Sequence, residues 1–162
     1  MQTRGTGRPA ISTLALTLVA VFLVAPGFVP RASAQTGVYT GLVIVVASVR
    51  VDRSVNPAVL TPTGELVYGR GWWKPGQLND EFAEQYGIVE YALSVAAANR
   101  VGPRPLIVYA VGVTGPPQST FKTDVVVSDE DALRIHDANT RSRFLQQMRV
   151  AIVNQMMAQN LP

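Results

Sequence analysis

The stretch from Val38 to Val51, VYTGLVIVVASVRV, decides how the rest of the chain is interpreted. It is rich in β-branched residues, and its centre, Val43 to Val46, has no polar side chain. A run of this kind favours a long strand in the middle of a sheet, covered by other elements on at least one face. The remaining segments are therefore expected to supply neighbouring strands and covering helices.

Four further strand segments follow along the chain. Ala58–Leu60 and Glu65–Tyr68 flank Thr61-Pro62-Thr63-Gly64, where a proline followed two residues later by glycine indicates a tight turn. This pattern predicts a short hairpin. Two other apolar segments, Pro105–Val113 and Thr123–Val127, are expected to form strands.

The first helix is expected to begin after Asn79, a suitable N-cap that is followed by acidic residues in the first turns. Beyond Gly87, which interrupts the pattern, apolar residues recur at helical spacing, so the helix is expected to continue as far as Gly102-Pro103. The residues on this apolar face are Ile88, Tyr91, Val95 and Ala98.

A second helix is expected to begin after Ser128, with Asp131 in the position of a capping box, and to end between Asn139 and Phe144. Residues 148–158 fit either a strand or a helix. The order of elements predicts an α+β fold: a two-layer sandwich of a mostly antiparallel sheet with two helices on one face.

The first 34 residues have the three parts of a secretory signal peptide. Two arginines precede an apolar run, Ile11 to Val24, and small residues at Ala32 and Ala34 suit a signal peptidase that would leave Gln35 as the new N-terminus. The apolar run spans about 14 residues, whereas a bilayer span needs roughly 20. Cleavage is therefore favoured over an uncleaved anchor, although both remain open. Residues 35–162 are expected to form a single domain in the periplasm or outside the cell.

The basic character of the chain resides in this N-terminal segment. The whole chain has 14 Lys and Arg against 11 Asp and Glu. Cleavage would remove three arginines (Arg4, Arg8 and Arg31) and no acid, which leaves eleven residues of each sign. A nucleic-acid partner is therefore not expected. Because the sequence contains no cysteine, disulfides, thiolate nucleophiles and a lipid on cysteine are not expected either.

Several segments, taken in order, resemble a family of small exported bacterial proteins that includes the twenty-kilodalton outer-membrane lipoproteins and the flagellar assembly lipoprotein FlgP. The matching segments are Tyr39–Ile44, Leu66–Gly69, Gln85–Ala92, Asp124–Ala132, Phe144-Leu145 and Arg149–Val153. The resemblance implies a curved antiparallel sheet with helices against it, a strand in the last segment, and a non-enzymatic role in the cell envelope. Some members assemble into rings around the flagellar motor, so the resemblance implies a scaffold or assembly role.

Two departures from that family matter. Its first strand usually runs into Asp-Ala-Arg-Gly, whereas this chain has Val45-Val46-Ala47-Ser48. FlgP-like members also carry a lipobox cysteine, which this sequence lacks. A flagellar role that depends on the lipid is therefore less expected.

The single histidine, His136, has Asp137 beside it and the acidic residues 129–131 a turn or two earlier. A metal site usually needs three or four converging ligands, and acids at a helix start stabilise the helix dipole without further function. The sequence also contains no G-x-S-x-G elbow, P-loop or dinucleotide fingerprint. No catalytic residue, metal ligand or cofactor site is therefore expected.

The Trp72-Trp73 pair, in a Gly- and Pro-rich loop, is the most unusual dipeptide. Tryptophan anchors many interfaces, so the pair is a candidate for binding a peptide, a glycan or another partner. The competing interpretation is a loop that one indole pins to the core. The function predicted first is self-association or binding of an envelope protein partner, and the alternative is a glycan- or peptide-binding module built on Trp72-Trp73.

Overall fold

The sheet has the Gly41–Val46 strand near its centre, in a computed structural model that describes residues 38–155. Seven strands follow the order β3-β2-β6-β5-β1-β7-β4, and the described residues belong to one compact unit. The strands are β1 (Gly41–Val46), β2 (Val59–Leu60), β3 (Leu66–Tyr68), β4 (Glu90–Ala92), β5 (Pro105–Thr114), β6 (Asp124–Val127) and β7 (Val150–Asn154). The helices are α1 (Asp80–Tyr86) and α2 (Asp129–Ser142), with single 3₁₀ turns η1 (Arg70–Trp72) and η2 (Val95–Ala97).

The prediction of a mostly antiparallel sheet is wrong. The pairs β1–β5, β1–β7, β4–β7 and β2–β6 are parallel, and only β2–β3 and β5–β6 are antiparallel. The fold is therefore an α/β arrangement with a mixed, mostly parallel sheet and two helices. All six residues of β1 are buried, as in parallel strands that are covered on both faces.

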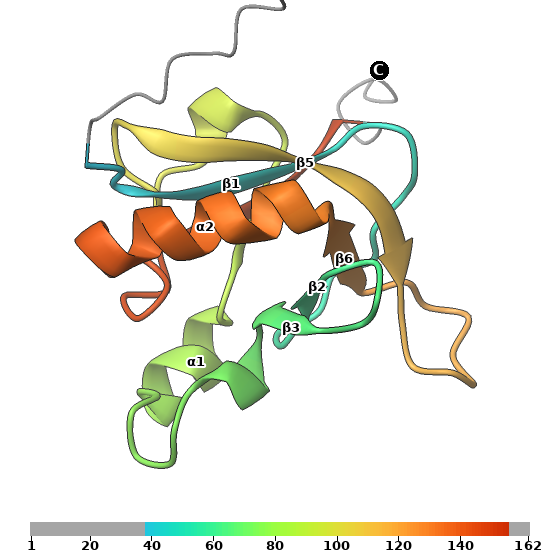
Figure 1. The fold of residues 1–162 in the computed structure, drawn as a ribbon. Helices are drawn as coiled ribbons and strands as arrows, with labels where there is room; N and C mark the ends of the chain where they lie inside the picture. Colours follow the sequence, from blue (N-terminus) through green and yellow to red (C-terminus); the bar gives the residue numbers. More distant parts are fainter. Residues whose placement is uncertain (1–37, 156–162) are drawn as a thin grey trace, which may run out of the picture. The chain divides into compact units, whose positions relative to one another are not determined.

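An apolar cluster lies on each face of this sheet. The larger contains alternate residues of β1, β5 and β7 and side chains from both helices, including Ala83 and Ile135. Figure 1 shows α2 lying across β1 and β5 on this face. The smaller cluster covers the opposite face of β1 and β7 with the segment 92–101. This second covering segment contains η2 rather than an α-helix.

The first helix is shorter than its sequence pattern predicts. Asn79 accepts a hydrogen bond from the Phe82 N–H at 3.0 Å, which confirms the predicted N-cap. The helix ends at Tyr86 because Gly87 takes a φ of 71°, in the left-handed region that favours glycine. The predicted continuation through Ile88 to Ala98 is therefore wrong, and that stretch contains β4 and η2 instead.

The second helix and the hairpin confirm their predictions. Ser128 accepts the Asp131 N–H at 3.1 Å, and α2 ends at Ser142, inside the predicted range. Strands β2 and β3 pair in an antiparallel way around the Thr61–Gly64 turn. Residues 150–154, left open between strand and helix, form β7.

Candidate functional site

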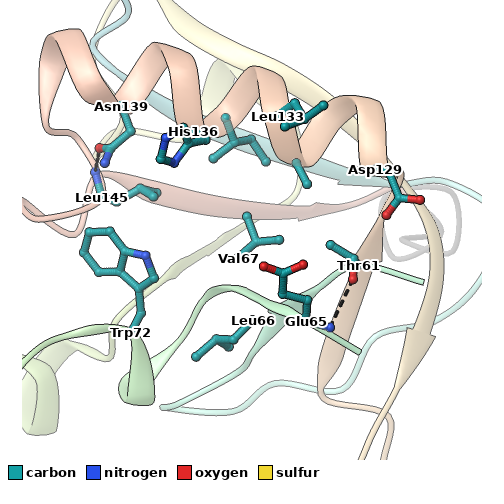
Figure 2. Close-up of a pocket in the computed structure, with 12 residues that line it drawn as sticks. Thr61, Glu65, Leu66, Val67, Trp72, Asp129, Leu133, His136, Asn139 and Leu145 are labelled. Carbon is teal, nitrogen blue, oxygen red and sulfur yellow. Dashed lines mark hydrogen bonds between the residues drawn. The ribbon is translucent and has the colours of Figure 1, made fainter. Parts of the chain in front are cut away.

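A cleft of about 480 Å³ lies between α2 and the β2–β3 hairpin. Figure 2 shows α2 on one side of it, and the hairpin and Trp72 on the other. The hairpin side consists of Thr61, Glu65, Leu66, Val67 and Trp72. The helix side consists of Asp129, Ala132, Leu133, Ile135, His136 and Asn139, with Leu145 just beyond the helix.

The tight turn between β2 and β3 positions the residues on the hairpin side of the cleft. The Thr61 hydroxyl accepts the Glu65 N–H at 3.0 Å, and the Thr61 N–H donates to the Glu65 carbonyl at 2.9 Å. Gly64 completes the turn with a φ of 86°. These bonds hold Glu65 at the start of β3, and Figure 2 shows its carboxylate pointing toward α2. The next residue, Leu66, is 38% exposed.

Helical periodicity brings the lining residues of α2 together on the other side of the cleft. The lining positions on α2 recur at three- and four-residue intervals from Asp129 to Asn139, so they share one face of the helix. At a rise of about 1.5 Å per residue, they extend over roughly 15 Å. Leu133, in the middle of this face, is 67% exposed although its side chain is apolar.

The far end of the cleft is fixed by a buried side chain. The Asn139 carboxamide oxygen accepts the Leu145 N–H at 2.9 Å, just past the end of α2. This bond ties the loop after the helix back onto its last turns. Asn139 therefore has a structural role at the margin of the cleft, and Leu145 is buried beside it.

The two tryptophans have different environments. Trp73 is 9% exposed and packs edge-on against Tyr68, with ring centroids 5.0 Å apart. Trp72 is half-buried, stands perpendicular to Trp73 at 5.4 Å and lines the cleft. One indole thus pins the loop to the core, while the other faces the cleft (Figure 2). Partner binding by Trp72 and Trp73 stays a prediction.

The cleft contains acidic side chains but no basic lysine or arginine. Its lining includes two carboxylates, Glu65 and Asp129, the His136 imidazole, and no lysine or arginine. Within the described residues, neither carboxylate forms an ion pair, whereas the neighbouring Asp131 pairs with Arg134 at 2.6 Å. Glu65, Asp129 and His136 are all exposed residues. The cleft therefore presents negative charge to solvent beside its apolar walls.

Sequence reasoning missed Glu65, Leu66 and Leu133 as members of a site. The available signal was Leu133, an apolar residue among charged ones in the first half of α2. Its significance depends on the hairpin that lies opposite, which local sequence does not reveal. In the described residues, no group of three His, Asp or Glu side chains is arranged to hold a metal ion.

Two tyrosines outside the cleft are anchored in the core. Burial raises the pKa of the Tyr68 phenol far above its usual value, and its hydroxyl donates to the Ile88 carbonyl at 2.8 Å. Burial also raises the pKa of Tyr91, an effect partly offset by the Ser54 N–H that donates to its hydroxyl. Tyr91 lines a second hollow of about 290 Å³ with Arg53 and Tyr86.

The chain matches a known family over most of its length. The family model described as Treponema pallidum Tp0624, second domain, matches residues 41–156. This range begins with β1 and passes the end of β7, so it includes every helix and strand described above. This chain belongs to the Tp0624 second-domain family. No curated protein matches the chain. The family match does not bear on FlgP, so that resemblance stays a prediction.

The predicted signal-peptidase site, Ala32, Ala34 and Gln35, lies outside the described residues, as does the whole segment 1–34. Between residues 38 and 155, no helix has both the length and the apolar character needed to cross a membrane.

Proposed function

We propose that this protein is a non-enzymatic, exported component of the cell envelope whose domain binds a segment of a partner protein in the cleft between α2 and the β2–β3 hairpin. Export rests on the predicted signal peptide, and a scaffold or assembly role rests on the resemblance to FlgP-like lipoproteins. The family description names a second domain, which fits a fold used as one module of a longer protein. No lipid anchor, nucleic acid or cofactor is part of this proposal.

The observation that carries the proposal is the pair of exposed leucines on opposite sides of one cleft. Leu66 contributes from β3 and Leu133 from α2, and Trp72 extends the apolar lining. Exposing Leu133 to water forgoes about 1 to 2 kcal/mol of burial that a bound apolar side chain would recover. The cavity volume of about 480 Å³ falls within the range typical of ligand sites.

A peptide segment fits this cleft better than a glycan. Sugar rings stack on the open face of an aromatic ring, but Trp73 is buried and Trp72 is half-buried against Trp73 and Tyr68. The exposed apolar groups are instead branched aliphatic side chains, which pack against side chains of a polypeptide. A glycan remains the alternative ligand, bound through Trp72.

A titration followed by NMR tests the proposal. Full-length protein labelled with ¹⁵N is mixed with an equimolar library of capped pentapeptides and, separately, with chitotriose. We expect the peptides to shift the amides of residues 65–67 and 129–139 and the Trp72 indole N–H, and Leu133→Ser to abolish these shifts. Leu93→Ser is the matched control, because Leu93 is also exposed, at 41%, but lies away from the cleft lining. Shifts caused by chitotriose alone would favour the glycan alternative, and no shift from either probe would contradict cleft binding.

Self-association is a second candidate function, favoured by a different surface. Three alternate residues of β5, here called its open face, are exposed: Ile107 at 38%, Tyr109 at 61% and Val111 at 62%. A second copy could bury this face, whereas the edge strands β3 and β4 have only three residues each and offer little for edge pairing. Light scattering at increasing concentration tests this function. A dimer that Tyr109→Lys dissociates would support it, and a monomer at all concentrations would contradict it.

A further inference from the structure

The charged groups of the cleft indicate which peptides it accepts, and this inference rests on the proposed function. The cleft lining has two carboxylates, Glu65 and Asp129, and within residues 38–155 neither of them forms an ion pair. They come from different elements, one from the hairpin and one from the first turn of α2. In Figure 2 both lie toward the start of α2, whereas Trp72 lies toward its last turns.

The helix dipole does not cancel this negative charge. The N-terminus of a helix carries about half a positive charge, which normally attracts anions. Here three acidic residues occupy the first turn, and among the described residues only Asp131 forms an ion pair, with Arg134. The Ser128 hydroxyl already accepts the Asp131 N–H, so one of the free amide donors is also used. An anionic ligand is therefore disfavoured at this end, and a cation is favoured.

The rest of the cleft lining is suited to a ligand that carries apolar groups along an extended chain. The lining of α2 extends over roughly 15 Å, which at about 3.3 Å per residue corresponds to four or five residues of extended chain. Leu66 and Leu133 border the middle of this path, and Trp72 borders its far part. A small amine would satisfy the carboxylates but leave these apolar groups exposed.

We infer that the cleft binds an extended, basic peptide segment, with a Lys or Arg side chain against Glu65 and Asp129 and apolar side chains against Leu66, Leu133 and Trp72. Charge complementarity selects the partner, and apolar contact holds it. The attraction is screened by salt because both carboxylates are exposed.

Three capped pentapeptides that differ only in charge test this inference by NMR titration of the full-length protein: Lys-Leu-Ala-Leu-Lys, Gln-Leu-Ala-Leu-Gln and Glu-Leu-Ala-Leu-Glu. We expect the lysine peptide to bind at least about tenfold more tightly than the glutamate peptide, with the glutamine peptide between them. The double variant Glu65→Gln/Asp129→Asn is expected to reduce this difference to less than about twofold.

The control is Glu130→Gln/Asp137→Asn, which removes the same charge from two exposed residues outside the cleft lining and is expected to keep the preference. If all three peptides shift the cleft amides equally, or if the Glu65/Asp129 variant keeps the preference, the charge inference is wrong while cleft binding stands. If none of the peptides shifts those amides, both the inference and the proposed function fail.

Discussion

Strands β1 and β5 lie side by side, and both are rich in Val and Ile, yet their surroundings differ. Every residue of β1 is buried, with exposures of 0 to 1% from Leu42 to Val46. On β5, Leu106 and Val108 are buried while Ile107 and Tyr109 are exposed to solvent. The register pairs Val43 with Ile107 and Val45 with Tyr109, so covered and open positions are direct neighbours.

The difference arises from the segment 92–101, which covers β1 and β7 but not β5. This cover depends on close contact: a Cβ atom on Gly41 would lie 2.5 Å from the Val101 carbonyl oxygen. It is also tethered by Glu90, whose carboxylate accepts the Arg100 N–H at 2.7 Å and the Asn99 N–H at 3.2 Å. A loop held by a few polar contacts can thus determine which face of an apolar strand belongs to the core.

The largest effect is expected from a comparison of one isoleucine on each strand. Ile44→Ala in β1 removes a fully buried side chain and is expected to lower the free energy of unfolding by about 3 to 4 kcal/mol. Ile107→Ala in β5 removes a side chain that is 38% exposed and is expected to cost less than about 1 kcal/mol. Urea denaturation measures both. Equal losses would show that the open face of β5 is buried in solution.

Two glycines, Gly41 in β1 and Gly112 in β5, differ in how closely other atoms approach them. Gly41→Ala forces the new methyl group into the Val101 backbone, so we expect a loss of about 2 kcal/mol from overpacking. Gly112→Ala on β5 is the matched control, because the nearest atom to its Cβ is a side-chain carbon of Val126 at 3.9 Å. Thermal denaturation should show a lower Tm for the first variant only. A stable Gly41→Ala protein would mean that the cover can move aside.

The hydrogen bonds between Glu90 and the segment 92–101 are expected to contribute less to stability than this packing. Glu90→Ala removes the acceptor for two backbone N–H groups and should cost about 1 kcal/mol. Because the loss is local, hydrogen exchange should speed up at residues 95–101 while the amides of β5 keep their protection. Glu84→Ala, an exposed position on α1, is the control. Unchanged exchange at residues 95–101 would show that apolar packing alone holds the cover.

Local signals in the sequence predicted the elements that are fixed locally. The Thr61–Gly64 turn and the Ser128 cap each depend on residues within a few positions, so the hairpin and α2 were predicted. Strand direction was not, because β1 pairs with β5 and β7, whose residues Pro105 and Val150 lie far along the chain. The helical spacing of Ile88 to Ala98 predicted a helix that does not form. The left-handed Gly87 ends α1, and β4 then pairs with β7.

In the candidate site, too, some residues could be recognised from the sequence and others could not. Trp72 attracts attention in the sequence because a tryptophan pair is unusual, and it does line the cleft. Glu65 and Leu133 are ordinary residues for a hairpin and a helix, and they form one site only because α2 and the hairpin face each other across the cleft. Tertiary packing of this kind leaves no trace in local spacing, so the cleft could not be predicted from the sequence.

The smallest expected effect is the sharpest test of the open face of β5. Tyr109→Thr replaces a side chain that is 61% exposed with another residue that suits strands, so stability should change by less than about 0.5 kcal/mol. The register partner on β1 gives the contrast: Val45→Thr places a hydroxyl in a position that is 1% exposed and should cost about 1 to 3 kcal/mol. Both variants are measured by urea denaturation at two protein concentrations. If Tyr109→Thr loses stability only at the higher concentration, a second copy covers this face, because stability that rises with concentration comes from association rather than from the fold of one chain.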